Sequence, residues 1–118
     1  MKKKITVIED SNDHSQMISH LLSSHDVNCA NNIVDFHNIQ NNHPDVIVLD
    51  DHLHSGFRNE LYYSLKDNPL TKNIPVILMT DKDTLLNSIA PGFNDCFIVK
   101  PFNPGYLVHK IINLIDAA

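Results

Sequence analysis

Five short apolar runs recur along this 118-residue chain, and an amphipathic stretch separates each run from the next. Apolar runs of four residues, bounded by polar or turn-forming residues, are typical of strands that are buried on both faces. We predict strands at residues 5–8, 27–30, 46–49, 76–79 and 96–99. Strands that alternate with helices form a parallel sheet with helices on both faces. The pattern therefore predicts an α/β protein with a five-stranded, doubly wound parallel sheet.

The stretches between the runs carry apolar side chains at the spacing of one helix face. They predict five helices, at about residues 17–22, 33–39, 57–65, 84–90 and 106–115. Pro44 ends the second of these helices, and Pro91 with Gly92 ends the fourth, because proline cannot continue a helix. Each predicted helix thus connects two predicted strands, or follows the last one.

The length suits one domain with a real core. The balance of 9 Lys and Arg against 14 Asp and Glu is mildly acidic, which argues against direct nucleic-acid binding, since such proteins present a basic face. No apolar stretch approaches the length of a membrane span or of a signal peptide's apolar region. Cys29 and Cys96 are far apart in the sequence, and we interpret them as reduced thiols of a cytoplasmic protein.

Three carboxylates follow two of the predicted strands. Glu9 and Asp10 come directly after the first strand, and Asp50 follows the third. In an open parallel sheet, the site lies beyond the carboxyl ends of the strands. Acids gathered there repel one another unless a cation intervenes, and oxygen ligands favour Mg²⁺. We predict Asp10 and Asp50 as direct ligands, with Glu9 acting through water.

Two further strand ends carry groups suited to phosphoryl chemistry. Thr80 ends the fourth apolar run and Lys100 follows the fifth. A carboxylate beside Mg²⁺ can attack phosphorus to form an aspartyl-phosphate, provided that charge and hydrogen-bond donors stabilise the phosphoryl oxygens. Each residue alone has an ordinary explanation, as a turn, a cap or a surface charge. Their coincidence at strand ends favours a site.

Four segments together resemble a known family over essentially the whole chain. They are ITVIEDS at residues 5–11, PDVIVLD at 44–50, IPVILMT at 74–80 and FIVKPF at 97–102. The chain resembles the receiver domain of two-component response regulators. The resemblance implies one receiver domain over residues 1–118, with the flavodoxin-like sheet order 2-1-3-4-5. It also implies a cytoplasmic signalling protein with no enzymatic activity beyond self-catalysed phosphoryl transfer and autodephosphorylation.

The resemblance also assigns roles to individual residues. Asp50 is implied as the phosphoacceptor, which receives its phosphoryl group from a sensor histidine kinase or a phosphotransfer domain. The implied Mg²⁺ ligands are Glu9, Asp10, Asp50 and the backbone carbonyl of His52. Thr80 and Phe97 are implied as the residues that switch conformation, and Lys100 as the phosphate-binding lysine. Pro101 stands where the family often has a cis peptide bond.

Several positions depart from the family pattern. His54 replaces a usual proline, Phe57 and Arg58 replace Asp-Gly, and Asp81 replaces a small residue beside the switch hydroxyl. Gly56 is a candidate to supply the special backbone angle of the missing turn. These departures motivate an alternative, in which a degenerate receiver binds a protein partner without being phosphorylated.

Three other interpretations stay open at this stage. Phe97 could be an ordinary core residue. His52 and His54 could bind a transition metal together, although pairs arise readily by chance among eight histidines. An aspartyl-phosphate hydrolase would also place its nucleophile after a strand. Such an enzyme would carry a second Asp two residues after Asp50, where this chain has His52.

Overall fold

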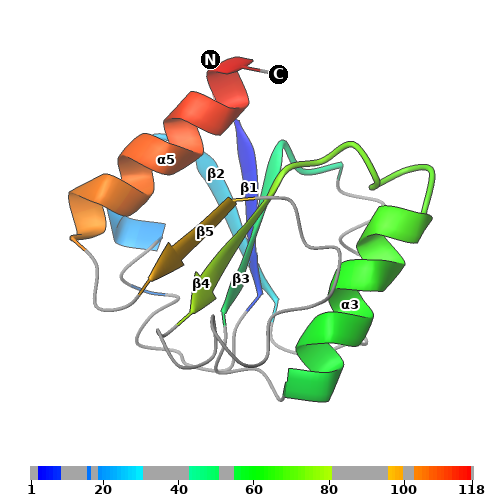
Figure 1. Ribbon diagram of the computed structural model, residues 1–118. Helices are drawn as coiled ribbons and strands as arrows, with labels where there is room; N and C mark the ends of the chain where they lie inside the picture. Colours follow the sequence, from blue (N-terminus) through cyan, green and yellow to red (C-terminus); the bar gives the residue numbers. More distant parts are fainter. Residues whose placement is uncertain are drawn as a thin grey trace.

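The computed structural model describes residues 3–8, 16, 19–30, 43–50, 55–80, 96–99 and 103–117. Two long helices pack on opposite faces of a central sheet, as Figure 1 shows. The strands are β1 (Lys4–Ile8), β2 (Asp26–Ala30), β3 (Val46–Asp50), β4 (Val76–Thr80) and β5 (Cys96–Val99). The two helices with assigned bounds are α3 (Ser55–Asp67) and α5 (Pro104–Ala117).

The sheet is parallel throughout, and its order is β2-β1-β3-β4-β5. This order confirms the predicted flavodoxin-like, doubly wound fold. The strand prediction was also accurate, since β5 has the predicted bounds and each other strand is longer by one residue. Two of these added residues, Asp50 and Thr80, are the last residues of their strands.

The structure confirms the predicted helices at 57–65 and 106–115 and extends both of them. Helical backbone at residues 16 and 19–21 agrees with the first predicted helix. The helices predicted at 33–39 and 84–90 lie outside the described residues. The suggestion that Gly56 forms a special turn was wrong, because Gly56 belongs to the first turn of α3.

The core has two layers, one on each face of the sheet. Alternate strand residues face opposite sides, so each strand contributes to both layers. The layer beneath α5 contains these buried side chains: Ile5, Val7, Leu22, Val46, Val48, Ile77, Met79, Ile98, Leu107, Ile111 and Ile115. The layer beneath α3 contains Ile8, Ile47, Leu49, Leu61, Tyr62, Leu65, Val76 and Leu78.

Asn103 caps the start of α5. Its Oδ1 accepts a hydrogen bond from the backbone N–H of Gly105 at 2.7 Å, and its carbonyl accepts one from Tyr106 at 2.9 Å. Pro104 occupies the first helical position, where its missing N–H costs nothing. This capping explains why the helix begins here, shortly after β5.

The two cysteines belong to opposite edges of the sheet. Cys29 is in β2 and Cys96 is in β5, with three strands between them. Four strand spacings separate their backbones by roughly 19 Å, whereas a disulfide needs Cα atoms within about 7 Å. The fold therefore excludes a disulfide between them within one chain. In the described part of the chain, no helix combines the length and hydropathy that crossing a bilayer requires.

Candidate functional site

The carboxyl ends of four neighbouring strands reach the same edge of the sheet at nearly the same level. Ile8, the last residue of β1, pairs with Leu49, and Asp50 follows directly in β3. Asp50 pairs with Met79, and Thr80 follows directly in β4. Thr80 pairs with Val99, the last residue of β5. Each strand thus ends within one residue of the level of its neighbour.

The predicted site residues are tied to these strand ends. In the sequence, Glu9 directly follows β1 and Lys100 directly follows β5. The predicted residues that lie outside the described part of the chain are Glu9, Asp10, His52, Lys100 and Pro101. Asp50 is described through its backbone, at the end of β3. β3 lies between β1 and β4. Asp50 therefore has two neighbouring strands, and a predicted site residue stands at or directly after the end of each.

Thr80 is fully buried, with 0% of its surface exposed. By alternation along β4 it belongs to the face that carries Leu78 and α3. Phe97 of β5 pairs with Leu78 of β4 and therefore lies on that same face. It is on the strand next to that of Thr80, two residues before Val99, the residue that pairs with Thr80. Diagonal neighbours of this kind on adjacent strands are within reach of long side chains. The structure thus places the two predicted switch residues on the same face of adjacent strands.

Phe97 is 44% exposed, so the alternative that made it an ordinary core residue was wrong. Val99, on the same face, is 37% exposed. Val99 was not singled out from the sequence. Alternation places it on the face of Phe97, but the apolar run at 97–99 carries no sequence signal that this face is exposed. Of these three residues of β5, only Ile98 is buried, on the α5 side. Phe97 and Val99 therefore present apolar surface on the α3 side of the sheet.

The predicted Mg²⁺ site depends on carboxylates that follow β1 and β3. Among the described side chains, no group of three or more His, Cys, Asp or Glu residues is placed to hold a metal ion. The predicted ligands Glu9, Asp10 and His52, and the side chain of Asp50, lie outside that set. The ends of β1 and β3, which these residues follow or include in the sequence, are adjacent in the sheet, and carboxylate and carbonyl oxygens suit Mg²⁺.

The strand order and the aligned strand ends define the class. This is a flavodoxin-like, doubly wound protein, and proteins of this class bind their ligands beyond the carboxyl edge of the sheet.

Comparison with known proteins narrows the class to a family. The phosphate regulon transcriptional regulatory protein PhoB of Pseudomonas aeruginosa is 33% identical over 115 residues, which cover 92% of this chain and 50% of that protein. The chain therefore spans about half the length of this curated relative. The hybrid signal transduction histidine kinase D of Dictyostelium discoideum is 26% identical over 97% of this chain and 8% of that protein. No protein-family model matches.

A solved structure gives the same result. The receiver-modulated diguanylate cyclase from Pelobacter carbinolicus superposes with a TM-score of 0.81 at 26% identity, covering 98% of this chain and 93% of the other. The predicted resemblance is thereby confirmed: the chain has response regulators as homologues and response regulator receiver domains as structural neighbours. Receiver domains are regulatory modules, and the cyclase activity named in that structure is a property of that protein.

Proposed function

We propose that residues 1–118 form one phosphorylatable receiver domain of a cytoplasmic two-component phosphorelay. Asp50 accepts a phosphoryl group from a phosphohistidine donor in the presence of Mg²⁺. The observation that carries this proposal is the strand register, which sets the ends of β1, β3, β4 and β5 side by side. The groups that phosphoryl transfer needs all stand at those ends, or one or two residues beyond them, in the sequence.

The transfer is an exchange of one bond to phosphorus for another. A carboxylate oxygen of Asp50 forms a bond to phosphorus, the bond between phosphorus and the donor imidazole nitrogen breaks, and the imidazole takes up a proton. Lys100 neutralises charge on the phosphoryl oxygens, and the hydroxyl of Thr80 donates a hydrogen bond to one of them. Asp10, Asp50 and the carbonyl of His52, with Glu9 acting through water, would hold Mg²⁺, which would supply further positive charge.

Switching follows from the positions of Thr80 and Phe97. A new hydrogen bond to the phosphoryl group draws the Thr80 hydroxyl toward Asp50 and changes the packing on the α3 side of β4 and β5. Phe97 is half exposed on that face and can move into the altered space. The phosphoryl group thereby favours one of two conformations of the domain.

The relatives support a kinase as the phosphoryl source. A segment of a hybrid histidine kinase matches nearly the whole chain, so receiver and kinase occur in one signalling system there. We propose a sensor histidine kinase or a phosphotransfer domain as the donor. PhoB is named as a transcriptional regulator, but the mildly acidic receiver chain is not expected to contact nucleic acid or a membrane itself. Nothing assigns its downstream protein partner.

A phosphodonor assay tests the proposal. The protein is incubated with Mg²⁺ and acetyl phosphate, and its intact mass is measured with and without EDTA. We expect one added phosphoryl group in the wild type, none after EDTA treatment and none in Asp50→Asn, which keeps the size of the side chain but removes the nucleophile. An adduct of equal amount in Asp50→Asn would show that another residue accepts the phosphoryl group.

The degenerate receiver remains the competing function, because an extra carboxylate, that of Asp81, directly follows the switch residue Thr80 in the sequence. It predicts no adduct with acetyl phosphate or with any phosphohistidine donor, and no Mg²⁺ binding in the millimolar range. A titration followed by NMR, in which Mg²⁺ shifts the signals of residues near Asp50, would exclude it.

A further inference from the structure

A set of side-chain hydrogen bonds ties the end of α3 to the start of β4. Thr71 lies in the connection between them and is only 1% exposed. Its hydroxyl donates to the carbonyl oxygen of Leu65 at 2.6 Å, and its backbone N–H donates to the carbonyl of Asn68 at 3.0 Å. Leu65 belongs to the last turn of α3, whose carbonyls have no partner within the helix.

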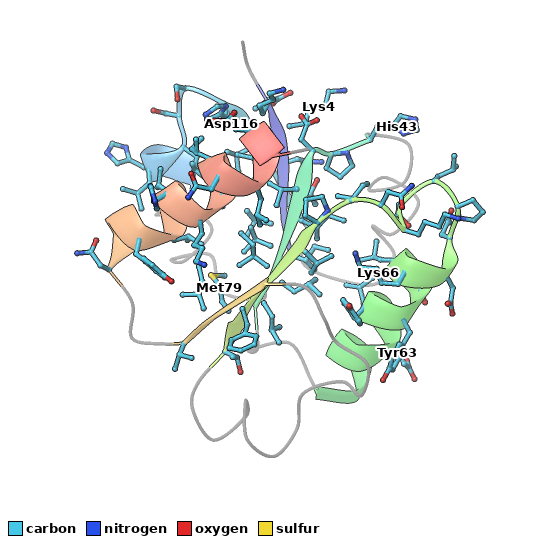
Figure 2. The ribbon with its side chains drawn as sticks, turned by 45° about the horizontal axis from the view of Figure 1, so that its top comes forward. Lys4, His43, Tyr63, Lys66, Met79 and Asp116 are labelled. Atoms are coloured by element: carbon cyan, nitrogen blue, oxygen red, sulfur yellow. The ribbon has the colours of Figure 1, made fainter. Side chains whose placement is uncertain are left out.

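Lys66 makes a second link between the end of α3 and the chain that enters β4. Its Nζ donates to the carbonyl of Ile74 at 2.9 Å and, more weakly, to that of Lys72 at 3.4 Å. The ammonium group also lies 5.9 Å from the centre of the Tyr62 ring, within the range of a cation–π contact. Figure 2 shows Lys66 on α3, where it reaches from the helix to the chain entering β4.

The apolar layer beneath α3 reinforces both ties. Leu65 of α3 and Val76 of β4 are buried in the same cluster, and Ile74 packs against it. The buried hydrogen bond from Thr71 to the carbonyl of Leu65 is costly to break, because that carbonyl would lose its partner without gaining water, whereas the bond from Lys66 to Ile74 is only partly buried. The end of α3 and the start of β4 are therefore held as one unit by Thr71 and Lys66, which we name the α3–β4 lock.

The opposite ends of α3 and β4, which are the start of α3 and the end of β4, are next to the proposed site residues in the sequence. α3 begins at Ser55, five residues after Asp50, and β4 ends at Thr80. We infer that Thr71 and Lys66 are positioning residues, which hold the helix that follows the phosphoacceptor and the strand that carries the switch hydroxyl in fixed relative placement. This inference rests on the proposed function of Asp50 and Thr80. Both lock residues act at a distance from the reacting atoms, through the packing of α3 and β4.

Matched variants test the lock. Thr71→Val removes the hydroxyl at nearly constant shape, and Thr71→Ser restores it. Lys66→Met removes the ammonium group and keeps an apolar stem, and Lys66→Arg restores a donor. For each variant, the rate of phosphoryl acceptance from acetyl phosphate, the Mg²⁺ affinity and the amide hydrogen exchange of residues 76–80 are measured well below the unfolding temperature.

We expect Thr71→Val and Lys66→Met to slow phosphoryl acceptance roughly two- to tenfold, as for other residues that couple distant elements. Mg²⁺ affinity should stay within about twofold of wild type, because its proposed ligands follow β1 and β3, and exchange at Thr80 should accelerate. Thr71→Ser and Lys66→Arg should recover most of the rate. A uniform loss of structure would instead lower the rate and the Mg²⁺ affinity together.

Two results would overturn the inference. One is an acceptance rate in both Thr71→Val and Lys66→Met equal to that of the wild type. The other is a loss of rate that tracks the Mg²⁺ affinity and is not recovered by Thr71→Ser. If the wild type itself accepts no phosphoryl group, the proposed function fails, and hydrogen exchange alone decides: unchanged protection of residues 76–80 in Thr71→Val then rejects the lock.

Discussion

Replacing Thr6 by valine should stabilise the protein. Thr6 lies in the middle of β1 and is 0% exposed. Its Oγ1 has no hydrogen-bond partner in the part of the chain that the structure describes. Thr6 pairs with Ile47 and shares the face of Ile8, so it borders the apolar layer beneath α3. A hydroxyl in this position has given up its hydrogen bonds to water without replacement.

The size of the gain follows from that burial. Leaving a buried hydroxyl without a partner costs about 1–3 kcal/mol in proteins. Valine keeps the β-branched shape suited to a strand and adds a methyl group where the hydroxyl was. We therefore expect the free energy of unfolding to rise by about 1–2 kcal/mol. A chain of 118 residues gains about 4 °C in Tm per kcal/mol, so Tm should rise by about 4–8 °C.

Urea denaturation and thermal unfolding, both followed by circular dichroism, measure this change. Thr6→Ser is the matched control, because it keeps the hydroxyl and loses the methyl group, and it should be less stable than wild type by about 1 kcal/mol. A Thr6→Val protein less stable than wild type would refute the reasoning, since it would show that the hydroxyl has a partner worth more than the methyl group.

Two further changes test local backbone features. Asn103→Ala should lower the free energy of unfolding by about 1 kcal/mol, because it removes the side-chain acceptor for the N–H of Gly105, whereas Asn103→Asp should retain stability; equal losses in both variants by urea denaturation would contradict a capping role. His43 has a φ of 50°, which non-glycine residues rarely adopt, so His43→Gly should raise the free energy of unfolding by up to about 1 kcal/mol and His43→Ala should not. An equal gain in His43→Ala by thermal unfolding would show that the imidazole, and not the backbone angle, is the source of strain.

Four of the strands were predictable because each contains a compact, largely apolar run between polar residues, whereas Asn28 interrupts β2 and made its signal weak. β5 matches its prediction at both ends, and the residues added to β3 and β4 are polar ones, Asp50 and Thr80, which the apolar pattern could not include. Gly56 was misjudged because glycine's preference for turns is weak against the packing of a helix that buries Leu61 and Leu65.

The sequence could predict which residues are candidates for the site, but it could not predict how they are arranged in space. The sequence shows which residues follow which strand, but adjacency depends on strand order, and order depends on contacts between distant segments. The exposure of Phe97 likewise could not be derived from its neighbours, because the same alternation fits a buried strand. The α3–β4 lock has no sequence signature, since Thr71 and Lys66 bond to carbonyl groups, which every residue possesses.

By itself, the sequence determined the five strands, the helices at 57–65 and 106–115 and the polar residues at the strand ends, because hydrophobic periodicity and turn residues act locally. The strand order was predictable only through the family resemblance, and the tertiary structure alone decided the register of the strands and the burial of each side chain. It placed β3 between β1 and β4, with Thr80 buried one strand from Asp50, and it set Cys29 and Cys96 on opposite edges. These features depend on how the two apolar layers pack against the sheet, which is a property of the whole chain.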